Sequence, residues 1–492
     1  MKKVIYVGFF FIYFALQPLI TNLPILLNAQ PGWSEDYRLT YRPGYSYNPR
    51  AVCNGDTIHL VWWEGYVDTI IHEEVFYKRS TDAGMTWEED VRLTQEDSIS
   101  AVTPSIGLWE NNIHVVWKEQ TAYYSAICYR RSEDGGNTWG NIDTILKTNL
   151  DGWYHPWIAV YENMIFLVAI KSGSGGQLVF VKSTDNGDSW LPSQDITIAK
   201  SLPRVKASSF DSLFLTVTYQ NTPEIYNIIS FDAGETWSDS QIVSEDDGVG
   251  SQCPAMDTDD SSGIYIVWYD YKYSPYPWTG DIFCRKSRDS GSTWEEIDSL
   301  TVMHRANWPD VLVEGNNLHL VWEDDRHEFN ENSEIYYRMS RDLGYTWGAE
   351  VRLTNASHQS WFPSLACDDN YLHLFWSDLR DDPSNIAGEI YYKRKDLSHS
   401  IDELNKPARI TNPRFEVSPN PFVRTLNIRL LTLTENIAMR IFDIAGEEVM
   451  FYQVKGSIGE FKISTKTLPC GLYFVQLKAG EESGMEKIVK IR

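Results

Sequence analysis

Short runs of alternating hydrophobic and polar residues recur along most of the chain and predict β-strands. The clearest run reads IHLVWWE at position 58, and related runs begin at 113, 165, 213, 264, 318 and 372. A period of two is typical of a strand with one buried face. Seven similar runs therefore predict seven copies of one structural unit.

Each unit predicts four strands. An inner strand follows a proline, as in TPSIGLW at 103, and the alternating run comes next. A run such as EVFYKRS at 74 and a short outer run such as VRLT at 91 complete the unit. A ring of such sheets packs each face on a neighbour, which one sheet alone cannot do. The expected fold is an all-β propeller of seven four-stranded blades, with a six-bladed ring as the alternative.

An octapeptide of the form S-x-D-x-G-x-x-W joins the third and fourth predicted strands in six units. Its aspartates are spaced 52, 51, 47, 57 and 53 residues apart. Aspartate accepts backbone hydrogen bonds in tight turns, and glycine adopts positive φ without strain. We therefore expect a structural turn, with the tryptophan packed between blades.

These octapeptides resemble the Asp boxes, or BNR repeats, of sialidase-like β-propellers, and the resemblance covers residues 37–411. In that family the boxes lie on the outer side of the blades, away from the active site. The resemblance thus implies structural roles for the box aspartates, which are Asp82, Asp134, Asp185, Asp232, Asp289 and Asp342. Either YRLT at 37–40 or ARIT at 408–411 is expected to close the ring as an outer strand.

The two ends of the chain predict export. Residues 1–29 carry two lysines and an apolar run, as in a signal peptide, with an uncleaved membrane anchor as the alternative. Residues 415–492 predict a small immunoglobulin-like β-sandwich. Its stretches SPNPF, RIFDIAGEEV and LPCGLYFVQL resemble the type IX secretion C-terminal sorting domain, although a non-sorting module of similar pattern is the alternative. We expect a secreted or outer-surface protein that engages the export and sorting machinery.

The composition of the chain argues against several classes of partner and ligand. A net charge of −25 argues against nucleic acid and anionic membranes, and no later segment is apolar enough to span a bilayer after signal cleavage. The six cysteines have no metal-binding spacing; Cys253 and Cys284 either pair or remain buried thiols. The loop DTDDSSG at 257 resembles a calcium loop but lacks the downstream glutamate, so we predict no metal and no cofactor.

Candidate binding residues gather in the connections that should emerge over the central funnel, opposite the octapeptide turns. Aromatic and charged side chains at a funnel mouth suit sugar stacking and hydroxyl recognition. The candidates from the outer-to-inner connections are Tyr47, Trp153, His155, His304, Arg305, Trp308, His358 and Trp361.

A second set of candidates forms a column two residues after the strand tryptophan. Five units have an acid there, the other two have Lys171 and Tyr219, and a basic residue follows in three units. The column is either a repeated structural ion pair or a ring of binding groups, and its recurrence favours structure. The binding candidates from the column are Asp324, Arg326, Asp378 and Arg380.

Two functions fit these patterns, and a structural or adhesion protein without a small ligand is a third. The favoured one is binding of a carbohydrate or surface-protein ligand through the funnel, because propellers host many activities. The alternative, by resemblance, is an exo-sialidase or related glycosidase with three carboxylate-gripping arginines, an acid/base aspartate and a tyrosine nucleophile activated by a glutamate. Arg42 in YRPG is then the one candidate for that trio, since the motif is only partly matched.

Overall fold

The computed structural model describes residues 32–397, apart from 43, 67–71, 98, 150–151, 174, 210–212, 260, 274–279, 302–304, 327–331 and 382–387. In the C-terminal part it describes 415–418, 423–434, 437–442, 448–454, 458–466, 468–469, 471–479 and 482–490. The chain divides after Asp396 into two compact units. The regular structure of the described residues is β-strand throughout, and none of it is a helix suited to crossing a bilayer. The predicted signal peptide lies outside these ranges.

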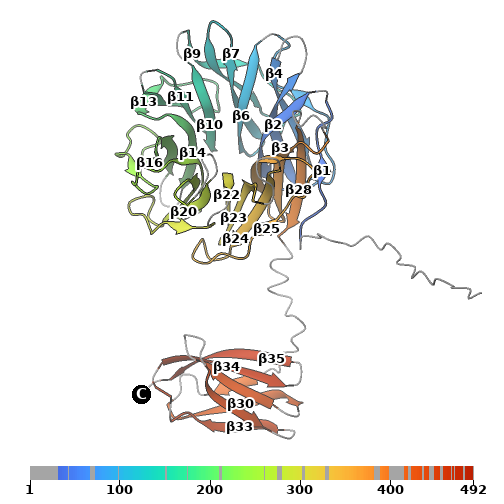
Figure 1. Ribbon diagram of the computed structural model, residues 1–492, viewed down its shortest axis with the longest axis vertical. Coiled ribbons are helices and arrows are strands. Elements are labelled where there is room, and N and C mark those ends of the chain that lie inside the picture. Colours follow the sequence, from blue (N-terminus) through green and yellow to red (C-terminus); the bar gives the residue numbers. More distant parts are fainter. Residues whose placement is uncertain are drawn as a thin grey trace, which may run out of the picture. The chain divides into compact units, whose positions relative to one another are not determined.

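The first unit is a ring of seven four-stranded blades, so the six-bladed alternative is wrong. Figure 1 shows the blades following one another around the ring in chain order. Blades 1 to 3 comprise β2 (Tyr45–Asn54), β3 (Thr57–Tyr66), β4 (His72–Ser80), β5 (Val91–Arg92); β6 (Ser100–Trp109), β7 (Asn112–Gln120), β8 (Ser125–Ser132), β9 (Asp143–Thr148); and β10 (Trp153–Tyr161), β11 (Met164–Lys171), β12 (Gln177–Ser183), β13 (Gln194–Thr197).

The remaining blades repeat this order. Blades 4 to 6 comprise β14 (Ser201–Ser209), β15 (Leu213–Asn221), β16 (Glu224–Ser230), β17 (Gln241–Ile242); β18 (Ser251–Thr258), β19 (Ile264–Asp270), β20 (Asp281–Ser287), β21 (Asp298–Ser299); and β22 (Ala306–Glu314), β23 (Asn317–Asp324), β24 (Glu334–Ser340), β25 (Val351–Arg352). Blade 7 comprises β26 (Ser360–Cys367), β27 (Tyr371–Asp378), β28 (Glu389–Asp396) and β1 (Tyr37–Arg38).

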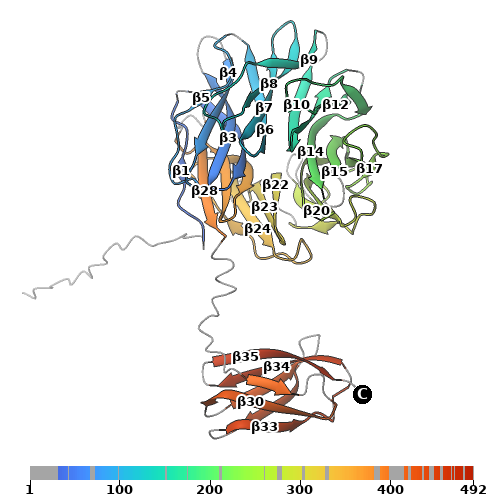
Figure 2. The ribbon, with the colours of Figure 1, turned by 180° about the vertical axis from the view of Figure 1, so that it is seen from behind.

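The N-terminal strand closes the ring. β1 pairs antiparallel with β28 through Tyr37 opposite Tyr392 and Arg38 opposite Tyr391, and the two strands lie side by side in Figures 1 and 2. The amide of Leu39 also donates to the carbonyl of Ile390 at 2.8 Å. YRLT therefore supplies the outer strand of blade 7, whereas ARIT lies outside the described residues.

Each octapeptide forms the turn between the third and fourth strands of its blade. In the second of them, both the hydroxyl and the amide of Thr138 donate to the Asp134 carboxylate, at 2.6 and 2.8 Å, and the Ser132 hydroxyl donates at 2.8 Å. These hydrogen bonds lower the pKa of Asp134 to about 2. The exposed carboxylate therefore organises its own turn.

The turns also join neighbouring blades. Arg79 of blade 1 donates to the carbonyl of Gly135 in the turn of blade 2, and Arg394 of blade 7 donates to that of Ala83 in blade 1, both at 2.5 Å. The turn tryptophan packs edge-on against an aromatic ring of the preceding blade, as with Trp139 on Tyr77 at 4.9 Å. Tryptophan thus lies between blades, as expected.

In the fourth unit, the alignment of the hydrophobic run with those of the other units is wrong by two residues. Arg204 pairs with Thr218 where Arg50 of blade 1 pairs with Val61. Tyr219 therefore occupies the position of the strand tryptophan, and the column position two residues later belongs to Asn221. The comparison of hydrophobic runs slipped by two residues here because a slip of two keeps the same faces buried.

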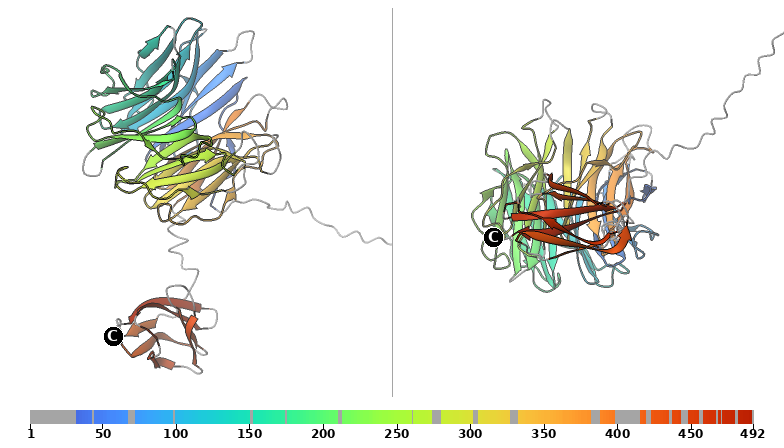
Figure 3. Two further views of the ribbon diagram at one scale, coloured as in Figure 1. Left: turned by 60° about the vertical axis from the view of Figure 1, so that its left-hand side comes forward. Right: turned by 90° about the horizontal axis from the view of Figure 1, so that it is seen from below.

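The C-terminal unit consists of two packed sheets. One sheet has the order β29 (Phe415–Ser418), β30 (Thr425–Thr434), β33 (Ile458–Ser464), and the other β32 (Glu448–Val454), β31 (Ile437–Phe442), β34 (Gly471–Ala479), β35 (Glu482–Lys490). Both contribute to one core, with Leu426 and Ile463 from the first and Met439 and Val475 from the second. The strands of this unit are also seen in Figure 3. The unit is the expected small β-sandwich.

Candidate functional site

All seven inner strands share a bulge at an X-Pro-X triplet. The residue before the proline has a φ between +45° and +58°, and the pairing with the second strand shifts register there. The strands begin before the proline, not after it as expected, because a bulge accommodates a residue without a backbone N–H inside a paired strand. The seven residues before the prolines are Asn48, Thr103, His155, Leu202, Cys253, Trp308 and Phe362.

The residues that follow the prolines break the symmetry of the ring. Six of the seven line a cavity of about 280 Å³ among the inner strands, and in six blades the residue two positions further on lines it as well. In three blades the first of these positions holds a charge: Arg50, Arg204 and Asp310. In two blades the second holds one: Lys206 and Asp257. Scaffold positions repeat in this fold, so a non-repeating set of charges indicates a site.

Two guanidinium groups flank one indole in this cavity. The guanidinium carbon of Arg204 lies 3.8 Å from the ring centre of Trp157, and that of Arg50 lies 5.4 Å away. Their hydrogen bonds are to the carbonyls of Pro49 and Pro203, at 2.9 and 3.3 Å. Among the described residues, no carboxylate is within ion-pair distance of either group. Most of their donors are therefore free to bind an anion.

The pKa shifts of the buried charged groups also favour an anion site. Burial, and next the adjacent Arg50, lower the pKa of Arg204 to about 9. Burial also lowers the pKa of Arg50, which Asp310 opposes. Burial raises the pKa of Asp310, and its carboxylate accepts the amide of Leu365 at 2.8 Å. A bound anion would relieve the cost of holding two like charges out of water.

The third cation is already paired. Lys206 Nζ lies 2.8 Å from an oxygen of Asp257, whose other oxygen accepts the amide of Val313 at 2.8 Å. Burial by itself lowers the pKa of Lys206, but the Asp257 carboxylate outweighs it and raises the pKa. Lys206 and Asp257 therefore form a neutral pair on the cavity wall.

A second cavity of about 200 Å³, called the rim, lies toward the start of the inner strands, the end away from the octapeptide turns. The two cavities together are called the channel. The rim shares Arg50, Trp157 and Arg204 with the first cavity. Its wall on blades 6, 7 and 1 is aromatic, with Trp308 and Phe362 in edge contact at 5.1 Å. One wall thus offers flat apolar rings and the floor offers cations.

Some predicted residues reach this rim. His155 and Trp308 line it directly. Burial lowers the pKa of His155 to about 4, with Arg204 and Lys118 adding to the effect, so its imidazole is neutral at pH 7. Tyr47 and Trp361 extend the aromatic wall, because each contacts Phe362, at 6.4 and 6.3 Å.

Other predicted residues lie apart from both cavities. Trp153 is buried, Arg305 lies 3.8 Å from Asp325, and His358 lies on the connection before β26. Arg42 is 3.3 Å from Asp90 and lies over the Phe76 ring at 4.6 Å, near the outer part of blade 1. His304 lies outside the described residues. None of these described side chains lines the channel.

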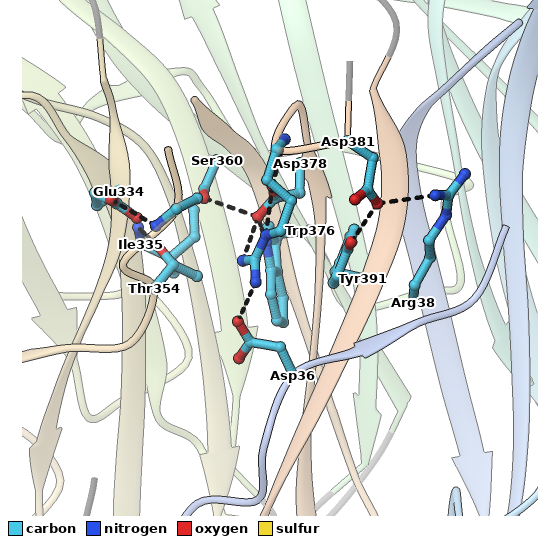
Figure 4. Close-up of polar contacts among 12 residues, drawn as sticks. Asp36, Arg38, Glu334, Ile335, Thr354, Ser360, Trp376, Asp378, Asp381 and Tyr391 are labelled. Carbon is cyan, nitrogen blue, oxygen red and sulfur yellow. Dashed lines mark hydrogen bonds and ion pairs between the residues drawn. The ribbon is translucent and has the colours of Figure 1, made fainter. Parts of the chain in front are cut away.

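The acidic column consists of local networks. Asp378 accepts hydrogen bonds from Trp376 Nε1 at 2.7 Å and Ser360 at 3.1 Å, and it pairs with Arg380 at 2.6 Å (Figure 4). Arg380 also reaches Asp36 at 2.7 Å. Asp324 likewise binds Trp322 at 3.1 Å and pairs with Arg326. These paired groups lie at the strand ends and do not line the channel.

Replacing Asp378 tests this structural role. We expect Asp378→Asn to lower the free energy of unfolding by about 2 kcal/mol, because a buried charge partner of Arg380 is lost while the shape is kept. The measurement is a denaturant unfolding curve followed by tryptophan fluorescence. The exposed Asp239→Asn is the matched control and should change stability by less than about 0.5 kcal/mol. Equal effects of the two substitutions would contradict the assignment.

The residues that form the cavity were absent from the sequence-based candidates. The signal that identifies them is the triplet itself, which recurs as NPR, TPS, HPW, LPR, CPA, WPD and FPS. Its third residue varies from arginine to aspartate among otherwise similar units. Arg50, Trp157, Arg204 and Asp310 all occupy that third position.

The remaining predictions concern metals and thiols. The Asp259 carboxylate in the loop DTDDSSG accepts hydrogen bonds from Ser261, Gly263 and the Tyr265 hydroxyl, so it organises its own turn. Cys253 and Cys284 are buried free thiols. No cluster of metal-binding side chains occurs in the described ranges.

Comparisons with known proteins identify the C-terminal unit. The secretion system C-terminal sorting domain family matches residues 416–491, so the chain carries a sorting domain that indicates secretion or display at the outer surface. No curated protein matches the chain.

Several solved structures are similar to parts of the chain. They include a protein of unknown function from Dyadobacter fermentans (13% identity, TM-score 0.47, covering 74% of this chain and 99% of that one). Two others are the NanB sialidase mutant K499G from Streptococcus pneumoniae (11%, 0.44, 74% and 71%) and the endosialidase of phage phi92 (10%, 0.46, 92% and 87%).

Proposed function

We propose that the protein is a secreted or surface-displayed propeller that binds an acidic glycan in its central channel. The observation that carries the proposal is the pair Arg50 and Arg204, which flank Trp157 without a carboxylate partner among the described residues. Guanidinium groups bind carboxylate and sulfate oxygens with directed, charge-assisted hydrogen bonds. A monoanionic group between them would complete the site.

The aromatic wall favours a sugar as the rest of the ligand. Trp63, Trp308 and Phe362 present flat rings beside the two arginines. Sugar rings have apolar faces that stack on aromatic side chains, and their hydroxyls take up the polar groups of a concave site. A surface-protein ligand would need a broad, flat interface, whereas this site is a narrow channel.

The exo-sialidase alternative is less well supported. That chemistry needs three arginines around one carboxylate and a tyrosine beside a glutamate. The described residues that line the channel include Arg50 and Arg204 but no tyrosine, and Arg42 is engaged with Asp90 elsewhere. We therefore propose binding without turnover.

The other parts of the chain fit an exported binding protein. Residues 1–29 would act as a signal peptide, residues 37–411 would form the Asp-box propeller, and residues 415–492 would be the sorting domain that the secretion machinery reads. Under this proposal the six octapeptides are Asp boxes with a structural role, and the ligand binds on the opposite face.

Titration and turnover assays on the full chain test the proposal. We expect acidic oligosaccharides, such as sialyllactose and oligogalacturonates, to quench tryptophan fluorescence saturably, and neutral lactose to have no effect. A fluorogenic sialoside should release no fluorophore. Saturable binding of neutral sugars with equal affinity would contradict the anion site, and turnover of the sialoside would favour the glycosidase.

A further inference from the structure

The channel mouth continues on one side into a basic and aromatic surface on blades 2 and 3. Lys118 lies near the end of β7, and Tyr154 lies near the start of β10, so both are at the channel-mouth end of their blades. Lys118 Nζ lies 4.3 Å from the centre of the Tyr154 ring. In a chain with a net charge of −25, a cation at this position calls for a specific reason.

Lys118 is buried without a polar partner among the described residues. Its residue is only 8% exposed, and no hydrogen bond or ion pair engages its ammonium among the described residues. Burial lowers its pKa, and the charge of Glu73 opposes this. Tyr154 beneath it is 38% exposed. A lysine kept for solubility alone would extend into water instead.

A second pair of the same kind lies on the other face of blade 2. Lys147 Nζ lies 4.1 Å from the centre of the Tyr124 ring. The amide of Trp153 donates to the hydroxyl of Ser125 at 2.9 Å, which fixes the segment that carries Tyr124 against the segment that carries Tyr154. Tyr124 itself packs on the hydrophobic core between blades 1 and 2, so the two cation and aromatic pairs lie on opposite faces of blade 2 near its channel-mouth end.

Strand β10, which carries Tyr154, connects the Lys118–Tyr154 pair to the channel. Tyr154 contacts His155 at 6.3 Å, and His155 lines the rim with Arg204 and Trp157. Trp157 lies three residues after Tyr154, which corresponds to about 10 Å along a strand. A single sugar held at Trp157 cannot also contact both outer pairs.

We propose, building on the acidic-glycan function, that the ligand is an acidic oligosaccharide of several residues and not a single terminal sugar. One anionic sugar binds Arg50 and Arg204 in the channel. The next ones run outward over His155 to the Lys118–Tyr154 pair and then across the channel-mouth end of blade 2 to the Lys147–Tyr124 pair. Each pair offers one aromatic face and one cation, which suits a repeating chain with a charge on its successive units.

Affinity as a function of chain length tests this inference. The full chain is titrated with galacturonic acid and its trimer and hexamer, and in parallel with chondroitin sulfate oligosaccharides, which carry sulfate as well as carboxylate. We expect affinity to rise about tenfold from the shortest to the longest member of the series that binds. In Lys118→Ala and in the exposed variant Lys147→Ala, the gain with length should fall to threefold or less, while affinity for the shortest sugar stays within twofold.

Controls separate this inference from the function on which it rests. Lys466→Ala removes the same charge from an exposed position in the other compact unit and should leave the length dependence unchanged. Lys118→Arg should retain it. If affinity does not depend on length, or if both lysine variants keep the gain, the extended site is wrong although the channel site stands. If no acidic sugar of either series binds, the proposed function itself fails.

Discussion

Arg204→Ala is expected to weaken binding of an acidic sugar about 100-fold. Arg204 lies closest to Trp157 and presents its guanidinium to the cavity, so its loss removes a charge-assisted pair of hydrogen bonds to the anion. A factor of 100 corresponds to about 2.8 kcal/mol of binding free energy. The measurement is a fluorescence or calorimetric titration with an oligogalacturonate at fixed ionic strength.

Two further variants identify the cause of that loss. Arg204→Lys keeps the charge but not the planar fork, and we expect it to lose about tenfold in affinity. Arg341→Ala removes an exposed arginine from an octapeptide turn, on the face away from the channel mouth, and should bind within twofold of the parent. Unchanged affinity in Arg204→Ala would contradict the channel as the binding site. An equal loss in Arg341→Ala would indicate a long-range charge effect only.

The architecture could be predicted from sequence because it is repeated. Seven alternating runs and six octapeptides each predict the same four-stranded unit. An alignment error in one unit therefore does not change the predicted fold. The slip in the fourth unit illustrates this, since Tyr219 was assigned to the wrong position without changing the expected fold. Two points needed the structure: the choice between six and seven blades, and the closing strand, for which the two candidate runs have similar sequences.

The binding residues could not be predicted in the same way. The bulge at each X-Pro-X triplet shifts the register of the inner strand, so the alternation read from the start of the strand does not tell which side chains face the axis. Arg50 and Arg204 therefore read as ordinary strand residues. The connections between strands contain more aromatic and charged residues, and two of these candidates, His155 and Trp308, line the rim. In contrast, Asp378 and Arg380 form an ion pair with each other.

The seam between blades 7 and 1 should be sensitive to a small substitution in a turn. Gly84 in the first octapeptide has a φ of +78°, and a Cβ there would overlap the hydroxyl oxygen of Tyr392 in blade 7. Tyr392 cannot easily move, because it is buried, its hydroxyl lies 2.8 Å from His373 Nδ1, and Trp87 packs on its ring at 5.3 Å. Gly84→Ala must therefore separate the two blades.

We expect Gly84→Ala to lower the free energy of unfolding by about 3 kcal/mol, from backbone strain and the overlap together. Gly248→Ala is a matched control, because Gly248 has a φ of +75° with no atom within 4 Å of the added methyl, so about 1 kcal/mol of strain alone is expected. Denaturant unfolding measures both. Adding Tyr392→Phe to Gly84→Ala removes the overlapping oxygen and should recover part of the difference. Equal losses in the two glycine variants would show that the seam does not depend on this contact, and that the strand pairing of β1 with β28 alone closes the ring.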